Sequence, residues 1–302
     1  MAEWDPEIEV DANHARSLIE TQFPELGGAT IAEVAAGWDN VVFLVDDRWA
    51  FRFPRRAIAI AGVEREIRTL PRLAPHLPMP IPEPRFVGRP TEDYPWPWFG
   101  AAWIPGTELA AAGLTEAGRI PVGSAIGAFL RELHSSRLSR LVGGDLPVDP
   151  MRRADMGYRV SFTRQRLDQA IAAGLWEPTA DVEGLLQRAA GLPPPPRTLV
   201  LHGDLHVRHL LVTAEGEATG VIDWGDMSAG DPSVDLSIAY GCFVGPAREA
   251  FVDAYGPIDG LTELRARVIA TFLAAALLTY AADRGMDDLR TEARVSLDRV
   301  VT

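Results

Sequence analysis

Short apolar runs separated by turn-forming residues dominate the first hundred positions of the chain. Their length and their content of β-branched and aromatic residues are typical of β-strands. We therefore predict strands over residues 30–34, 41–45, 49–53, 85–87 and 98–103. Two helices are expected among them, one capped by Asp11 and one over residues 58–73, where Pro71 should kink the helix or end it near Leu70.

Beyond residue 104 the apolar positions recur every three or four residues, which is the spacing of an amphipathic helix. In the range 122–134, for example, Ile126, Phe129 and Leu133 fall on one side. The same rhythm predicts helices over residues 156–173, 181–190, 247–255, 261–282 and 287–300. The second part of the chain is therefore expected to be mainly helical.

The two patterns meet at Ile104, Pro105 and Gly106, where a proline and a glycine interrupt both of them. We place the boundary there and predict an N-terminal lobe of residues 1–103 and a C-terminal lobe of residues 104–302. The fold class is then α+β, with a small β-rich lobe followed by a larger and mainly helical lobe.

The amino-acid composition limits the classes of protein to which this chain can belong. The 302 residues are 47% hydrophobic and 24% charged, which suits one large or two ordinary globular domains. A formal net charge of -13 argues against a nucleic acid partner, because phosphate binding needs a basic face. All 29 basic residues are arginine, so a Schiff-base lysine and a P-loop lysine are both excluded.

Three features bear on the compartment. The acidic N-terminus lacks the basic and then apolar order of a signal peptide. The longest apolar stretch, 268–282, is interrupted by polar residues and is judged too short to span a bilayer, so we predict a core helix there. Cys242 is the single cysteine, which rules out an internal disulfide and favours the cytoplasm.

A predicted hairpin organises the second half of the chain. Its two short strands are expected over residues 210–212 and 220–222. If the turn pivots near Gly216, antiparallel pairing sets His209 opposite Asp223. Asp204 lies five residues before His209, in the loop that enters the hairpin.

This arrangement suits phosphoryl transfer. The reaction needs a group that orients the acceptor hydroxyl and metal ions that neutralise the phosphates. Mg²⁺ usually takes one or two carboxylates from a protein. We predict that Asp204 is the catalytic base and Asp223 the main metal ligand. A single aspartate is more often a cap or a turn former, so the prediction rests on the pair and its spacing.

The residues around these aspartates resemble a known family. His202-Gly203-Asp204-Leu205, then Ile222-Asp223-Trp224 and the run 230–236 are similar to the aminoglycoside phosphotransferase family. The resemblance covers nearly the whole chain and is most specific between residues 201 and 236. It implies a bilobal protein-kinase-like fold, in which Asp204 matches the base and Asp223 begins the metal-binding triplet.

The chain departs from the kinase pattern at His209, where the pattern has asparagine. Neutral imidazole is a poorer ligand for Mg²⁺ than an oxygen atom. Histidine at this position resembles the macrolide 2′-phosphotransferase branch, as do the runs 49–56 and 278–285. We therefore predict that His209 binds the metal beside Asp223; the alternative is a structural histidine.

A second departure concerns the strand lysine that holds the phosphates, because Arg52 stands in its place. Arginine keeps the charge and can bind phosphate with two donors. We predict that Glu66, 14 residues further on, pairs with Arg52, and Glu64 is the alternative. The resemblance also places Trp103 and Ile104 where backbone groups meet the nucleotide base.

Other polar residues are expected to have supporting roles. We assign a structural hydrogen bond to His134 and support of the loop to His202. Asp231 and Asp235 are expected to start a helix and tether the loop. His206 and Arg208 lie inside the loop that follows Asp204, where they could contact the phosphate or remain solvated.

The expected activity is transfer of the γ-phosphate of GTP or ATP, with Mg²⁺, to a hydroxyl of a small molecule, an antibiotic of the macrolide or aminoglycoside type. The protein should act as a cytoplasmic monomer without a nucleic acid or membrane partner. One alternative is a kinase of a small metabolite such as a sugar or amino alcohol. The other is an inactive kinase-like module that binds nucleotide.

Overall fold

The computed structural model describes residues 6–37, 39–195 and 198–302, and the chain forms two compact units. The first unit comprises residues 1–76, 80–105 and 223–227, and the second comprises residues 77–79, 106–222 and 228–302. The short segment that contains Asp223 thus belongs with the β-rich part of the chain. The simpler division into lobes of residues 1–103 and 104–302 stays a prediction.

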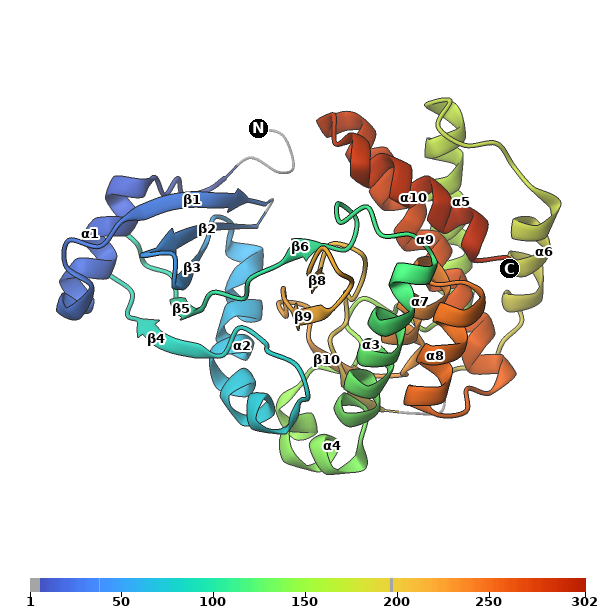
Figure 1. Cartoon of the computed structure of the whole chain (residues 1–302), viewed down its shortest axis with the longest axis horizontal. Helices are drawn as coiled ribbons and strands as arrows, with labels where there is room; N and C mark the ends of the chain where they lie inside the picture. Colours follow the sequence, from blue (N-terminus) through green and yellow to red (C-terminus); the bar gives the residue numbers. More distant parts are fainter. Residues whose placement is uncertain (1–5, 38, 196–197) are drawn as a thin grey trace. The chain divides into compact units, whose positions relative to one another are not determined.

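An antiparallel sheet of five strands forms the centre of the first unit, in the order β1-β2-β3-β5-β4 (Figure 1). The strands are β1 (Ile31–Ala36), β2 (Asn40–Val45), β3 (Trp49–Pro54), β4 (Pro84–Gly88) and β5 (Trp98–Ala102). In β2 every second residue is buried, so that Val41, Phe43 and Val45 pack into the core. All five predicted strands are confirmed, with ends that differ by at most a few residues.

Two α-helices complete this unit, α1 (Ala12–Gln22) and α2 (Ile60–Leu73). Asp11 caps α1 as predicted, because its carboxylate accepts the N–H of His14. Of the two predicted effects of Pro71, an end of α2 near Leu70 is wrong, since the helix continues through Pro71. Proline cannot donate a hydrogen bond, but the N–H of Ala74 still reaches the Leu70 carbonyl and keeps the last turn closed.

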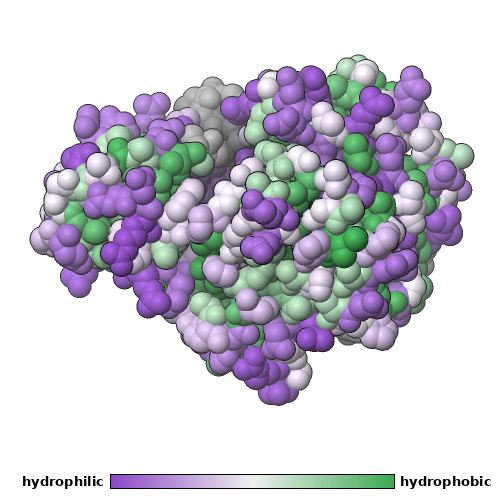
Figure 2. All heavy atoms as spheres, in the orientation of Figure 1, coloured by the Kyte–Doolittle hydropathy of each residue, from purple (hydrophilic) through white to green (hydrophobic). Residues whose placement is uncertain are grey.

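Helices make up most of the second unit (Figure 1). They are α3 (Ile120–Leu133), α4 (Ser136–Val142), α5 (Met156–Ala172), α6 (Ala180–Ala189), α7 (Ser233–Cys242), α8 (Gly245–Tyr255), α9 (Gly260–Arg284) and α10 (Asp287–Arg299). Short 3₁₀ turns occur in both units, at Pro24–Leu26, Ala57–Ala59, Ala74–His76, Ala117–Arg119 and Gly143–Asp145. On the face drawn in Figure 2, hydrophilic residues alternate with smaller hydrophobic patches, as is usual for a protein surface.

The predicted core helix over 261–282 is α9, and its packing supports that interpretation. Val268, Ala275 and Leu278 are buried in a cluster with residues of α5, α6, α7 and α10. The judgement that the stretch is too short to span a bilayer is wrong, because the helix has 25 residues. Among the described helices, α9 alone is long and apolar enough to cross a membrane by these two criteria.

Helix α7 had no prediction because its sequence has no polar face. All ten of its residues are buried. An amphipathic pattern arises only when one side of a helix meets solvent, so a helix surrounded by protein shows no such period.

Five short strands accompany the helices. β6 (Thr107–Glu108), β8 (Leu210–Val212) and β9 (Ala218–Val221) form a sheet in that order, and β7 (Leu199–Leu201) pairs with β10 (Ser228–Gly230). The predicted hairpin of β8 and β9 exists, and Gly216 adopts a positive φ of 84° in its turn.

The predicted register of this hairpin is wrong by one residue. Leu210 pairs with Val221, so His209 lies opposite Ile222 rather than Asp223, and its carbonyl accepts the N–H of Ile222 at 2.9 Å. The error comes from the turn, because Val212 pairs with Ala218 and the turn therefore centres on residue 215 rather than on Gly216. The irregularity between Leu211 and Val212 makes up one of the two residues of this difference.

We predict opposite effects of two helix glycines on stability. In α3, a methyl group at Gly127 would overlap the carbonyl oxygen of Phe251 in α8, so Gly127→Ala should lower the free energy of unfolding by about 1–3 kcal/mol. In α6, Gly184 has room for the methyl, so Gly184→Ala should raise it by about 0.5–1 kcal/mol. Urea unfolding of both variants measures the difference. Equal stability of the two would contradict the close packing of α3 and α8.

Candidate active site

A buried carboxylate on α7 holds the loop that contains Asp204, residues 202–209, which we name the Asp204 loop. Asp235 is fully buried and accepts the backbone N–H groups of His202 and Gly203 at 2.8 and 2.9 Å. The Nε2 of His134 lies 3.1 Å from the same carboxylate. Burial alone would raise the pKa of Asp235, but its partners, His134 foremost, outweigh burial and lower it. The predicted structural roles of His134 and Asp235 are borne out by these contacts.

His202 joins the start of the loop to the end of β9. Its Nδ1 accepts the N–H of Asp204 at 3.2 Å, so the ring proton is on Nε2, which donates to the carbonyl of Ile222 at 2.9 Å. Burial lowers the pKa of His202 and favours the neutral ring that this pair of contacts requires. Gly203, between His202 and Asp204, has φ 91°, a backbone conformation that favours glycine.

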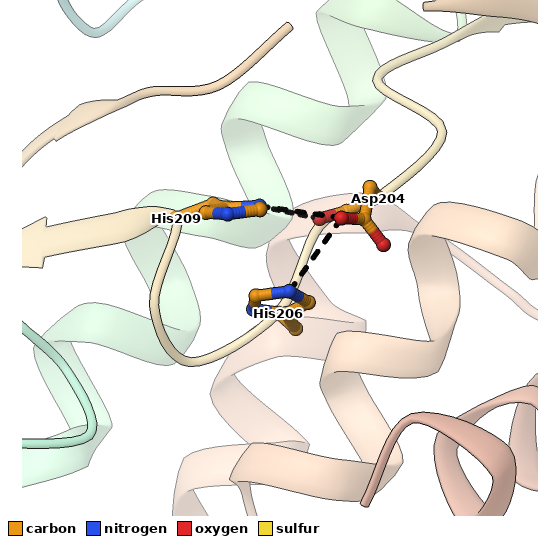
Figure 3. Close-up of side chains that lie close together, drawn as sticks. All are labelled: Asp204, His206 and His209. Carbon is orange, nitrogen blue, oxygen red and sulfur yellow. Dashed lines mark hydrogen bonds and ion pairs between the residues drawn. The ribbon is translucent and has the colours of Figure 1, made fainter. Parts of the chain in front are cut away.

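Asp204, His206 and His209 come together in this loop (Figure 3). The Oδ2 of Asp204 lies 3.6 Å from the Nε2 of His206 and 3.8 Å from the Nδ1 of His209. The two imidazole rings stack with their centroids 4.0 Å apart. Sequence analysis left the role of His206 open, and the structure adds this residue to the group around Asp204.

The carboxylate of Asp204 is ionised at neutral pH. Burial would raise its pKa, but the nearby His206, His209 and Arg153 outweigh burial and lower the pKa to about 2. The side chain remains 30% exposed, so a ligand can reach it. A carboxylate in this state can accept a hydrogen bond from a hydroxyl group and orient it.

A second group of charged residues lies in the first unit. Arg52 in β3 donates through Nη1 to Glu66 at 2.8 Å and through Nη2 to Asp223 at 2.9 Å. Glu66 is fully buried on α2, whereas Glu64 is on the exposed side of that helix. The pairing of Arg52 with Glu66 rather than Glu64 is therefore confirmed, and Arg52 is not a solvated surface residue.

Burial and the neighbouring charges shift the pKa values of both Glu66 and Arg52. Burial raises the pKa of Glu66 to about 7, although the charge of Arg52 opposes the shift. Burial by itself would lower the pKa of Arg52. The negative charges of Glu66 and Asp223 outweigh the effect of burial and raise the pKa of the guanidinium. Arg52 therefore keeps its positive charge at neutral pH.

Helix α2 also fixes the backbone next to Asp223. The Nη2 of Arg65 donates to the carbonyl of Gly225 at 2.7 Å, and a side chain at Gly62 would come within 2.9 Å of the same oxygen. Asp223 has φ 62°, in the left-handed region that is uncommon for residues other than glycine, and its side chain is 46% exposed. Its carboxylate is an oxygen donor of the kind that Mg²⁺ prefers.

The remaining predicted residues are placed as follows. Trp103 is 36% exposed and its backbone N–H donates to the carbonyl of Arg48, while Ile104 is buried. Their contact with a nucleotide base stays a prediction. His209 and Asp223 belong to different units, so their joint binding of a metal also stays a prediction.

We predict that Asp235→Asn destabilises the protein in a pH-dependent way. Loss of the carboxylate leaves buried donors poorly paired, so the free energy of unfolding at pH 7 should fall by about 1–3 kcal/mol. Because the native pKa of Asp235 lies below that of the unfolded chain, its stabilisation is present above about pH 4 and disappears as the pH falls through the native pKa.

Chemical unfolding at pH 7 and at lower pH values tests this expectation. The exposed Asp253→Asn, on α8, is the matched control and should change stability by less than about 0.5 kcal/mol. A difference between wild type and Asp235→Asn that widens in acid would contradict the argument.

Comparison with solved structures supports the fold. The GDP complex of wild-type aminoglycoside 2′-phosphotransferase-IIIa aligns with a TM-score of 0.69 and 20% identity over 97% of this chain and 99% of that one. Macrolide 2′-phosphotransferase MphH from Brachybacterium faecium aligns with a TM-score of 0.59 and 23% identity over 95% and 97%. The predicted kinase-like α+β fold is thereby confirmed.

Sequence comparison gives the family. The uncharacterized protein YcbJ of Bacillus subtilis (strain 168) is 24% identical over 217 residues, and the match spans 65% of this chain and 65% of that relative. A model of the phosphotransferase enzyme family matches residues 30–268, a range that contains both charged groups described above. This match confirms the predicted family. The chain belongs to the phosphotransferase enzyme family.

Proposed function

We propose that the protein transfers the γ-phosphate of a nucleoside triphosphate to a hydroxyl group of a small molecule, an antibiotic of the macrolide or aminoglycoside type. The observation that carries this proposal is the ionised and accessible carboxylate of Asp204, in a loop that Asp235 holds in place. Membership of the phosphotransferase family supports the type of reaction.

Asp204 would act on the acceptor. Its carboxylate accepts a hydrogen bond from the acceptor hydroxyl and so directs the oxygen towards the γ-phosphorus atom. A carboxylate with a pKa of about 2 is a weak base, so it orients the hydroxyl more than it removes the proton early. As the new P–O bond forms and the bond to the leaving nucleoside diphosphate breaks, the hydroxyl proton passes to Asp204.

Arg52 would act on the donor. Its guanidinium provides several N–H donors in a fixed plane, which matches the oxygen atoms of a phosphate group. Glu66 holds that plane in position through the 2.8 Å contact. Asp223 and His209 would hold Mg²⁺, which neutralises phosphate charge when it is bound.

The nature of donor and acceptor is supported by the related structures. The aminoglycoside enzyme was solved with GDP, which supports GTP as donor here, with ATP as the alternative. Similarity to that enzyme and to a macrolide phosphotransferase supports both classes of acceptor. A cytoplasmic monomer is part of the proposal, and the single, buried cysteine Cys242 agrees with a reducing compartment.

A panel of acceptors tests the function. Macrolides, aminoglycosides, sugars and amino alcohols are each incubated with ATP or GTP and Mg²⁺, and mass spectrometry detects a phosphorylated product. We expect at least one antibiotic to be phosphorylated. Products from sugars or amino alcohols alone would make the protein a metabolite kinase, and nucleotide binding without any product would make it an inactive module.

We predict that Asp204→Asn lowers kcat for the best acceptor by about 10²–10⁴-fold, because the amide cannot accept the hydroxyl proton. The KM for the nucleotide should change little, since Asp204 is assigned to the acceptor. Steady-state kinetics measure both constants. Asp168→Asn, on the exposed side of α5, is the control and should keep wild-type kinetics. Full activity of Asp204→Asn would refute the assignment.

We predict that Glu66→Gln raises the KM for the nucleotide by about tenfold or more, because Arg52 loses a charge-assisted hydrogen bond that contributes about 1.5–3 kcal/mol to its position. Glu64→Gln, on the exposed side of the same helix, should leave the KM unchanged. If both substitutions have the same effect, Glu66 does not position Arg52 for the phosphates.

A further inference from the structure

A groove in the second unit opens beside the Asp204 loop. Its lining is mainly apolar and includes Leu205 and Val207 of the loop, Ile238 of α7, and Leu273 and Leu277 of α9. The groove contains about 280 Å³ of space, part of which is open to solvent. It is therefore a surface feature that can receive an apolar face of a ligand but does not enclose a whole large molecule.

Two leucines of α9 keep apolar surface available at this groove. Leu273 and Leu277 are four residues apart and so lie on the same side of the helix. Both are only partly buried and pack against the core cluster of the second unit, whereas Ala270 and Ala274 beside them are buried. A ligand that covers the two leucines removes this apolar surface from water, which favours binding.

The groove is continuous with the carboxylate that we assign to the acceptor. His206 lines the groove, and its Nε2 lies 3.6 Å from the Oδ2 of Asp204 (Figure 3). Its Nδ1 accepts the N–H of Arg208, so the ring proton is on Nε2 and faces the carboxylate. A molecule on the groove is thus separated from Asp204 by a single imidazole ring. Its hydroxyl can reach Asp204 while its apolar part stays on the leucines.

The charges around Asp204 disfavour an acceptor with many positive charges. Arg153 lies close enough to help lower the pKa of Asp204, and Arg208 belongs to the loop itself. Glu108 of β6 accepts two N–H groups of Arg208, at 3.1 and 3.3 Å, so its negative charge is compensated within the protein. Like charges repel most strongly where water is partly excluded. A ligand with several ammonium groups would therefore meet repulsion from the two arginines.

We propose that the groove receives an apolar face of the acceptor, and that Leu273 and Leu277 determine its specificity. The acceptor is then a molecule that bears the reacting hydroxyl next to an apolar surface and carries few positive charges. Of the two antibiotic classes named above, this description fits a macrolide, whose ring carries methyl groups, and not an aminoglycoside, which carries several ammonium groups. The inference rests on the proposed function, since it concerns the acceptor of that reaction.

Binding is measured first, by calorimetry without nucleotide, with erythromycin as the macrolide and kanamycin as the aminoglycoside. We expect wild type to bind erythromycin at least about tenfold more tightly than kanamycin. Leu273→Gln and Leu277→Gln should each weaken erythromycin binding by about tenfold, because an amide replaces an apolar contact at similar size. Absence of erythromycin binding, or equal or tighter binding of kanamycin, overturns the proposal.

Leu264→Gln is the matched control. Leu264 is also on α9 and is also partly buried against the same core cluster, but it lies outside the lining of the groove. This variant should bind erythromycin as wild type does. Far-UV circular dichroism and thermal unfolding verify that each variant is folded. An equal loss of affinity in Leu264→Gln and in the folded groove variants overturns the role of the groove.

Turnover separates this inference from the proposed function. With the donor found in the panel, Leu277→Gln should raise the KM for erythromycin by about tenfold and leave kcat and the KM for the nucleotide unchanged, because the groove contacts the acceptor before and during the reaction alike. If erythromycin binds through Leu277 but no acceptor is phosphorylated, the proposed function fails and the groove remains a site for apolar ligands. If kanamycin is phosphorylated and erythromycin is not, phosphoryl transfer stands and the apolar acceptor is refuted.

Discussion

The buried carboxylate of Asp235 is the constraint on which the geometry around Asp204 depends. It accepts two successive backbone N–H groups and faces an imidazole inside protein, where an unpaired charge would be very unfavourable. Because all its partners are needed to compensate burial, the loop has little freedom to adopt another path. The position of Asp204, two residues after His202, follows from this anchor. Chemistry on the loop is thus supported from a helix that never reaches the surface.

Periodicity predicted most of the elements that have one face in solvent, although it missed the short helix α4. The strands of the first unit and the other amphipathic helices were found within a few residues of their ends. Helix α7, which carries Asp235, had no detectable pattern because protein surrounds it. The hairpin of β8 and β9 was predicted, but its turn centres on residue 215 rather than on Gly216, and after a bulge the register still differs by one residue.

The residues of the candidate site were also predicted only in part from the sequence. Residue type and spacing were enough to select Arg52, Glu66 and Asp223, which the structure brings together, and to prefer Glu66 over Glu64. The contribution of His206 could not be decided from the sequence, because it depends on ring orientation within the Asp204 loop. Its spacing of two residues from Asp204 was the available signal, and a solvated loop residue would have had the same spacing.

Arg52 is shared between two carboxylates, and this balance of charge affects how a nucleotide could arrive. Burial raises the pKa of Glu66 to about 7, so above that pH the group has two carboxylates against one guanidinium. A bare triphosphate would meet net repulsion there, despite the arginine. A nucleotide that already carries a divalent cation brings its own compensation to Asp223 and leaves the guanidinium available to phosphate oxygens. If the group binds the nucleotide as proposed, it favours the metal-bound form over the free anion.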